Sequence, residues 1–310
     1  MADLANNFVE SRVTVTAAEA GKVASSRPVP LPAQSGRKRK SSRLTGLTGR
    51  QYHVLRIVNS YGWVTPTMVG QIAVIHGIQW KSNLMYRLLA SLFDQGFLLA
   101  RRLDDGTKGV AYGISNLGLA YIRAHGDALL CDTNVEKDPA SFIHFVNLNR
   151  AVLRLANEFP TKFWLSDFQV RSDNTAIGAS GFAKDYDAVA EFLLPAGTVR
   201  VAFEYERWQQ SRRRYEKVAA VVEAEKYMHQ VLIFLDRTDW LESMMPFFRH
   251  LGSFVGFVDF RRYMSQGLDV YAKYWYGDQV YEAPLVKLLE HRCATQRPAY
   301  TPIHRLKFGF

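Results

Sequence analysis

Residues that start and stop helices recur at short intervals in the first apolar part of the chain, and they allow only short elements there. Apolar residues at helical spacing predict a helix over 49–61. Thr65 and Pro66 supply an N-cap followed by proline at the first helical position, so a second helix should begin there. A third helix is predicted over 80–95, because Gly96 suits the left-handed conformation that ends many helices.

A strand pair is expected after these helices. The segments 97–102 and 110–114 have strand-like patterns, and the turn-forming residues of 104–109 between them predict a hairpin. A closing helix should cover 116–125. Three helices, a hairpin and a further helix in this order are typical of a winged helix-turn-helix domain, which we expect over residues 45–127.

The third helix of such a domain enters the major groove of DNA, and the first half of the helix faces the base edges. Asparagine and arginine match adenine and guanine edges there, while lysine and serine suit phosphates. The candidate DNA-binding residues of the helix are Lys81, Ser82, Asn83, Tyr86 and Arg87. The wing would add Arg101, Arg102 and Lys108 as backbone contacts. The alternative is a module that mediates protein contacts or dimerisation and whose polar helix face is simply solvated.

The charge of the chain also points to nucleic acid. It has 39 Lys and Arg against 29 Asp and Glu, a net charge of +10, and a polyanion is the usual partner of a basic protein. Residues 1–44 are predicted to form a disordered basic tail, because they contain three prolines, several serines and glycines, and a terminal basic run. The tail either follows DNA or is merely solvated, and its basic run is Arg37, Lys38, Arg39 and Lys40.

The sequence indicates a cytoplasmic protein with no membrane partner. Its two cysteines, Cys131 and Cys293, are far apart, which excludes a zinc ribbon and a disulfide framework. No apolar run approaches the length that crosses a bilayer, and the N-terminus lacks the apolar core of a signal peptide.

An α/β domain is predicted over 138–290, followed by a basic C-terminal tail over 291–310. The domain should begin with a helix over 140–158 and contain a second helix over 211–228 and a third over 240–251. The predicted strands are 163–170, 185–194, 199–206, 231–235 and 255–260. This mixture of strands and helices indicates an α/β fold with a sheet.

Two successive strands of this domain each carry a pair of acidic residues separated by one position. Alternate side chains of a strand share a face, so Asp185 lies with Asp187, and Glu204 lies with Glu206. A tight turn through 195–197 would bring Asp187 close to Glu204. Carboxylates that converge are costly unless a cation neutralises them, and the hard divalent ions Mg²⁺ and Mn²⁺ prefer oxygen ligands. We therefore expect a metal site that activates water against a phosphodiester.

This pattern resembles the PD-(D/E)xK nuclease superfamily, in which an acid on one strand precedes an acid-x-Lys motif on the next. Asp187 stands in the first acidic place and Glu204 in the second, but Glu206 occupies the lysine position. Lys217, on the following helix, is the candidate replacement for that cation. The same helix begins with basic residues that could bind phosphate, namely Arg212, Arg213 and Arg214.

The order of these parts also resembles the replication-relaxation family, which includes MobC-type mobilisation relaxases of plasmids. The resemblance covers residues 47–236 and includes a helix that begins Phe-Ile-His-Phe-Val-Asn at Phe142. It implies a winged helix joined to a restriction-endonuclease-like α/β domain with a mixed sheet. It also implies metal ligation by Asp187 and Glu204, catalytic roles for these acids and Glu206, and a family histidine at His144.

These sequence patterns and the resemblance favour two candidate functions, and they support a third less well. The first is a metal-dependent endonuclease that nicks double-stranded DNA, such as an origin of transfer, during plasmid mobilisation and conjugation. The alternative is a sequence-specific regulator of replication or transcription that binds an operator, or a relaxosome accessory. In either case the nuclease-like domain is catalytically silent. The weaker one is an adaptor for relaxosome or replication proteins, and a homodimer fits each of the three. The sequence offers no glycine-rich phosphate loop and no histidine cluster of other relaxases.

Overall fold

The computed structural model describes residues 46–103, 109–127, 129, 133–135 and 142–303. The predicted basic tail, with Arg37, Lys38, Arg39 and Lys40, lies outside the described residues, as does Lys108 of the predicted wing. Residues Leu47–Phe310 make up one compact unit. No described helix is both long enough and apolar enough to cross a membrane.

The first part of this unit has the element order that the sequence predicts: α1 (Gly49–Tyr61), α2 (Pro66–Ile75), α3 (Ser82–Asp94), β1 (Leu98–Arg102), β2 (Val110–Ile114) and α4 (Asn116–Ala124). The hydroxyl of Thr65 accepts a hydrogen bond from the backbone of Met68, and Pro66 is the first residue of α2. Gly96 follows α3 with a φ of 83°, a conformation that is strained for residues with a side chain. Strands β1 and β2 pair antiparallel. Local capping and turn residues therefore determine where these elements start and stop.

The second part is a mixed α/β arrangement. Its elements are α5 (Phe142–Glu158), β3 (Thr161–Ser166), α6 (Asp167–Ile177), β4 (Ala188–Leu194), β5 (Gly197–Glu206), α7 (Arg212–Glu223), β6 (Gln230–Leu235), α8 (Leu241–Met244), β7 (Val255–Asp259), α9 (Phe260–Gln266), β8 (Tyr271–Tyr276), β9 (Gln279–Pro284) and α10 (Leu285–Cys293). A 3₁₀ stretch, Met245–Phe254, follows α8 and replaces most of the helix predicted over 240–251.

The strand predicted over 163–170 is wrong beyond Ser166. The hydroxyl of Ser166 accepts a hydrogen bond from the backbone of Gln169, and the Gln169 side chain accepts one from the backbone of Ser166. This reciprocal capping box starts a helix, and α6 begins at Asp167. This change from strand to helix matters for the candidate active site, because it places Asp167 at the end of β3.

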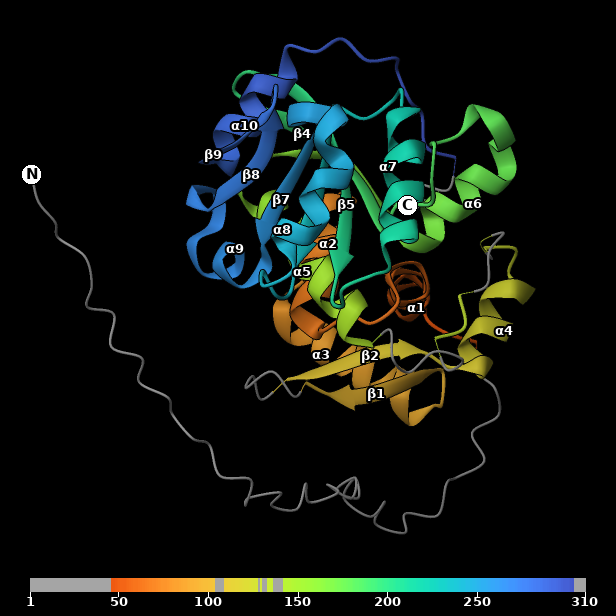
Figure 1. The fold of residues 1–310 in the computed structure, drawn as a ribbon. Helices are drawn as coiled ribbons and strands as arrows, with labels where there is room; N and C mark the ends of the chain where they lie inside the picture. The colour runs from red at the N-terminus through yellow and green to blue at the C-terminus, as the bar shows by residue number, and fades with distance from the viewer. Residues whose placement is uncertain (1–45, 104–108, 128, 130–132, 136–141, 304–310) are drawn as a thin grey trace, which may run out of the picture. The chain divides into compact units, whose positions relative to one another are not determined.

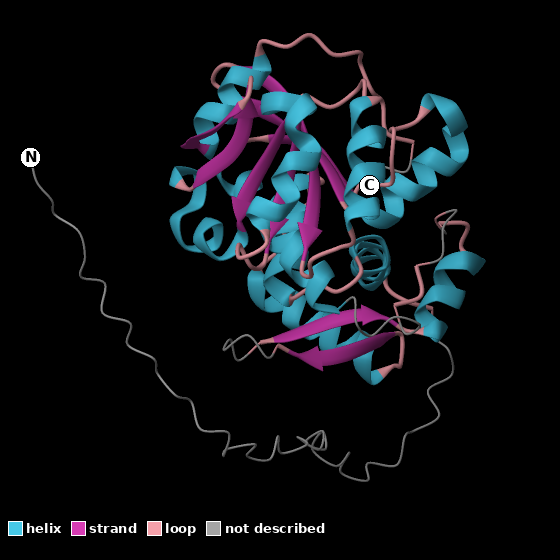
Figure 2. Cartoon of the chain, in the orientation of Figure 1, coloured by secondary structure: helices cyan, strands magenta, loops and turns pink. Residues whose placement is uncertain are grey.

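One sheet holds all seven strands of the second part, in the order β3-β4-β5-β6-β7-β8-β9. Strands β5, β6 and β7 run parallel, and the other neighbouring pairs are antiparallel. Helices lie on both faces of the sheet (Figure 2). Val201, Phe203 and Tyr205 belong to the core on the α5 side, and Ala202 belongs to the core on the α7 side. This alternation confirms the predicted two faces of the acidic strand.

The first helices and the sheet share one hydrophobic core. Residues from α1, α2, α5 and β5 belong to the same buried cluster, and the Tyr61 hydroxyl donates a hydrogen bond of 3.1 Å to the carbonyl of Trp164. Asn149 of α5 is buried, and its amide donates to the carbonyls of Tyr61 and Trp63, at 3.0 and 3.1 Å. Helix α5 therefore joins the two parts through both apolar and polar contacts.

We predict that Asn149→Ala lowers the free energy of unfolding by about 1–3 kcal/mol, because two buried carbonyls lose their donor. Asn157→Ala is the matched control. It removes an exposed asparagine from the same helix, which accepts a hydrogen bond from Gln71, and should change stability by less than about 0.5 kcal/mol. Urea unfolding monitored by circular dichroism measures both variants. Equal effects of the two substitutions would contradict the assigned role of Asn149.

Candidate active site

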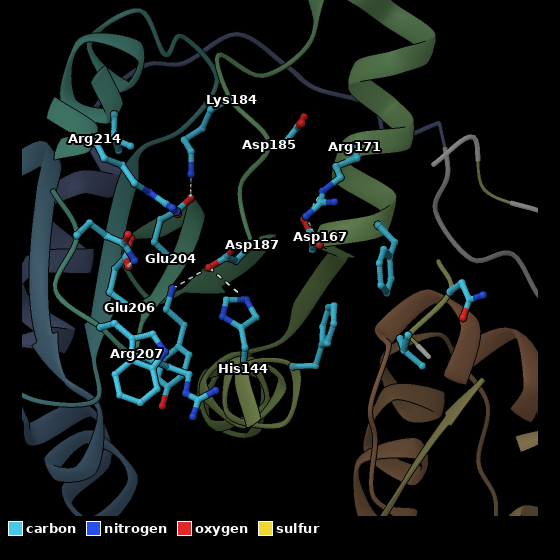
Figure 3. A pocket seen from close by; sticks show the side chains of 18 residues that line it. His144, Asp167, Arg171, Lys184, Asp185, Asp187, Glu204, Glu206, Arg207 and Arg214 are labelled. Atoms are coloured by element: carbon cyan, nitrogen blue, oxygen red, sulfur yellow. Dashed lines mark hydrogen bonds and ion pairs between the residues drawn. The ribbon is translucent and has the colours of Figure 1, made fainter. Parts of the chain in front are cut away.

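The acidic residues of two adjacent strands meet at one end of the sheet (Figure 3). Ala188 pairs with Phe203 in the antiparallel register of β4 and β5, so Asp187 and Glu204 occupy neighbouring positions just beyond that pair. The backbone N–H of Tyr205 donates a hydrogen bond of 2.8 Å to Asp187 Oδ2. Glu206 lies two residues further along β5, on the same face as Glu204. The structure therefore brings together the three acids that the sequence pattern singles out.

His144 reaches this cluster from α5. Its Nε2 atom lies 3.5 Å from Asp187 Oδ2. Burial alone would lower the pKa of His144, but the negative charge and hydrogen bond of Asp187, helped by Asp167 and Glu204, raise it to about 9. Burial alone would raise the pKa of Asp187, but His144, Lys184 and the Tyr205 N–H lower it to about 2. An imidazolium–carboxylate pair is thus the stable form at neutral pH.

The lysine at the cluster is Lys184, and this differs from the prediction. The Lys184 ammonium lies 2.5 Å from Glu204 Oε1. Lys217, by contrast, is an exposed residue of α7 and does not line the cavity. The reason is positional: Lys184 is three residues before Asp187, in the segment that enters β4, whereas Lys217 is on the second turn of a helix that packs through Tyr215 and Ala219.

A cavity of about 650 Å³ opens beside these groups. Basic residues from several elements line it together with the acids: Arg171 of α6, Arg214 of α7 and Arg207 at the end of β5. Arg171 forms an ion pair of 2.8 Å with Asp167, and Gln210 donates a hydrogen bond of 3.2 Å to Glu206. Acids and cations thus surround the same space, which suits a ligand that carries both a bound cation and negatively charged oxygens.

Burial disfavours the ionised form of several carboxylates of the cavity. Burial raises the pKa of Glu204 to about 8, with Asp187 adding to the effect and Lys184 opposing it. Burial likewise raises the pKa of Asp167 to about 7, although Arg171 opposes it. The pKa of Glu206 is also raised, by burial and by Asp187. An additional cation at this position would stabilise the ionised acids.

Whether these residues fit a divalent metal depends on how many protein ligands the ion needs. No set of three or more His, Cys, Asp or Glu side chains in the described part of the chain is arranged to hold a metal. Mg²⁺, however, is commonly held by one or two carboxylates and keeps several waters. Asp187 and Glu204, which occupy neighbouring positions at the ends of two paired strands, would be the carboxylates of a site of that second kind.

Among the predicted DNA-binding residues of the first part, the side chains of Lys81, Asn83, Tyr86, Arg87, Arg101 and Arg102 are exposed. Lys81 is the N-cap of α3, Ser82 is the first residue of the helix, and the exposed side chains along it are Asn83, Tyr86 and Arg87. Arg101 and Arg102 are exposed on β1, and the guanidinium of Arg101 lies 5.0 Å from the centroid of the Phe142 ring. Arg212 and Arg213 are exposed at the start of α7, while Arg214 faces the cavity.

Sequence reasoning missed several residues of the cavity. Lys184 and Asp167 were detectable: the lysine immediately precedes the acidic strand, and Ser166-x-x-Gln169 signals a helix start that places an acid beside the site. Arg171 follows from that helix, since it is one turn after Asp167. Trp208, which lines the cavity next to Arg207, had no signal in the alternation pattern, because it lies beyond the end of β5.

Comparison with known proteins adds little to this geometry. No family model matches the chain, and no curated protein matches it. Among solved structures, the chain is similar to a cysteine-to-serine mutant of Lactococcus lactis ZitR. The sequences are 16% identical, the match covers 39% of this chain and 68% of that chain, and the TM-score is 0.23. A likeness at this level says nothing about the function of the cavity.

We predict that Asp187→Asn lowers the pKa of His144 from about 9 to below its ordinary value of 6.5, because burial then acts without its main opposing charge. The pair stabilises the fold fully between about pH 4 and pH 6.5. The histidine's contribution is lost as the pH rises through about 9, and that of Asp187 is lost as the pH falls through about 2. NMR titration of the histidine ring measures the shift.

Asp185→Asn is the control for this titration, since Asp185 is exposed and bonds to Asn174 rather than to His144. It should leave the pKa of His144 near 9. A pKa that stays near 9 in Asp187→Asn as well would show that the pairing is not what raises it.

Proposed function

We propose that this protein binds double-stranded DNA and cleaves one strand of it with a divalent metal ion, as a relaxase-type endonuclease of a mobile element. The observation that carries the proposal is the meeting of Asp187 and Glu204 on adjacent strands, beside Lys184 and in a cavity lined by arginines. In this proposal the second part of the chain is a nuclease-like domain of the PD-(D/E)xK kind, and the first part is a winged helix.

The metal would be Mg²⁺ or Mn²⁺, held by Asp187 and Glu204. It would supply charge that polarises the phosphodiester and lowers the pKa of a bound water. The chain's own residues have distinct tasks. Asp187 is held in place by the N–H of Tyr205 and by His144. His144 is a positioning residue, because an imidazolium with a pKa of about 9 does not accept a proton at neutral pH.

Lys184 takes the place that Lys217 holds in the sequence-based hypothesis. Its ammonium lies at the edge of the acid pair, where it can stabilise negative charge that develops on a phosphate oxygen. Arg171 and Arg214, which line the same cavity, suit phosphate binding because a guanidinium matches phosphate oxygens in a forked geometry. These residues bind and orient the DNA backbone in the proposal.

The exposed face of α3 would select the DNA site. Asn83 and Arg87 carry the forked donors that read base edges in the major groove, and Lys81 suits a phosphate. An origin of transfer or an operator upstream of the gene is the proposed target. Relaxosome or replication proteins and a second copy of this chain are the proposed partners there.

A second candidate function is a DNA-binding regulator whose nuclease-like domain is silent. Two observations favour it: Lys184 already pairs with Glu204, and the described residues hold no three-ligand metal group. In that case the acidic cavity serves stability or binding alone.

The nicking proposal predicts that the full-length protein converts supercoiled plasmid carrying the gene's upstream DNA to open circles with Mg²⁺ or Mn²⁺, but not with EDTA. Glu204→Gln should lower the rate at least about 100-fold, because it removes a metal ligand. This variant should still fold, since glutamine resembles the protonated acid that the raised pKa already favours. Lys184→Met should lower the rate to a similar extent.

Two substitutions on α7 serve as controls for this assay. Glu216→Gln removes an exposed acid that pairs with Arg212, and Lys217→Met removes an exposed lysine. Both should nick like the wild type. If no metal supports nicking while the upstream DNA is bound, the silent regulator is correct and the enzyme is not.

For DNA reading, Arg87→Ala and Asn83→Ala should each weaken duplex binding by about 5- to 150-fold, as expected for the loss of a bidentate base contact. Lys81→Ala should weaken it less and reduce the salt dependence by about one phosphate contact. Fluorescence anisotropy over a range of salt concentrations measures both effects. Arg123→Ala, an exposed arginine of α4, is the control; equal losses there would point to charge alone.

A further inference from the structure

Trp208 is the exposed tryptophan of this protein. All six tryptophans lie in described residues; Trp208 is 65% exposed, while the other five are buried or partly buried. It lines the rim of the acidic cavity, two residues after Glu206. Exposure of so large an apolar surface is unfavourable in water, so its place beside a cavity of charged groups points to a ligand.

The loop that carries Trp208 is held on both sides of the ring. The Gln209 amide donates a hydrogen bond of 3.0 Å to Ser243 Oγ. The backbone N–H of Gln210 donates one of 2.8 Å to the hydroxyl of Tyr215, and its side chain bonds to Glu206. These bonds tie the loop to the 240s segment, to α7 and to β5. These hydrogen bonds therefore fix the loop on which the exposed indole lies.

One basic group contacts the indole, and three more follow within six residues of it in the chain. The guanidinium carbon of Arg207 lies 5.1 Å from the centroid of the ring, within the range of a cation–π contact. Arg214 lines the cavity on one side of the loop, and Arg212 and Arg213 lie exposed at the start of α7 immediately after it. An aromatic ring among cations is the arrangement on which unpaired nucleic-acid bases stack while their phosphates pair with the cations.

A duplex cannot use such a ring in this way. Its bases are already stacked on one another, so only an unpaired base, or one lifted out of the helix, presents a free face. Trp208 lines the same cavity as Asp187 and Glu204. A base stacked there would have its own phosphate near the acids.

We infer that Trp208 is a base-stacking residue and that the acidic cavity takes an unpaired DNA strand rather than intact duplex. This rests on the proposed function in one respect, that the cavity receives a DNA phosphate. Helix α3 would then hold the duplex part of the target, and Trp208 would hold an unpaired nucleotide of the strand to be cut.

The test is binding of the full-length protein, in EDTA, to a labelled oligothymidine single strand and to a mixed-sequence duplex of equal length. Trp208→Ala should weaken single-strand binding by about 5- to 100-fold and change duplex binding less than about 2-fold. Trp208→Phe should recover most of the loss, because a smaller ring still stacks. Tyr276→Ala, which removes a 67% exposed aromatic of β8, should change neither affinity.

Single-strand affinity that is unchanged in Trp208→Ala, or lost equally for both DNA forms, overturns the inference. So does a change in sedimentation of Trp208→Ala, which would make this surface a contact between copies of the chain. Because no metal is present, the outcome is independent of nicking. A failed nicking assay together with a Trp208-dependent single-strand affinity would reject the enzyme and keep the stacking site.

Discussion

The carboxylate of Asp187 is the point on which the site depends. It accepts a hydrogen bond from the β5 backbone and pairs with His144 of α5, so it fixes a helix to the end of two strands. The pairing also explains why two neighbouring acids differ. Asp187 has a pKa of about 2 because imidazolium and ammonium groups face it, whereas burial leaves Glu204 with a pKa of about 8. One strand end thus holds an ionised acid next to one that is easily neutralised.

Helix α5 connects this chemistry to the DNA-reading part of the proposal. His144 points to the acids, and Asn149, about one and a half turns later, binds carbonyls at the end of α1 and just beyond it. Residues after α4 take part as well: Thr133 donates a hydrogen bond to Asn59 of α1, and Val135 lines the cavity. Packed contacts and hydrogen bonds therefore connect the first helices to the segment beside the acids.

The sequence predicted the elements well where local chemistry decides them. Thr65-Pro66 and Gly96 act within a few residues, and the helix and strand bounds that they predict are confirmed. The two-residue alternation of β5 predicted which side of the sheet Glu204 and Phe203 face. The strand predicted through Val170 was wrong, because Ser166 and Gln169 form a capping box that overrides the apolar run.

The composition of the site was harder to predict, because it depends on where separate segments arrive. The nuclease motif places a lysine shortly after the second acid, and Lys217 is the nearest lysine that follows Glu204 in the chain. The structure supplies Lys184 from before the first acid, since the antiparallel pairing of β4 and β5 places the entry to β4 opposite the exit of β5. Asp167 and Arg171 come from a helix that the sequence reading did not contain.

The charges of the cavity bear on what it can hold. Five acids line it, Asp167, Asp185, Asp187, Glu204 and Glu206, and five basic residues, His144, Arg171, Lys184, Arg207 and Arg214. The formal charges balance, yet burial raises the pKa of Glu204 and Asp167. A divalent ion alone would leave an excess of positive charge when all the acids are ionised, and a phosphate alone would add to the negative charge. One phosphodiester would offset one of the two added positive charges, so in the proposed mechanism metal and DNA should each strengthen the binding of the other. Lys184 is compatible with this, because its ion pair contacts one oxygen of Glu204, Oε1.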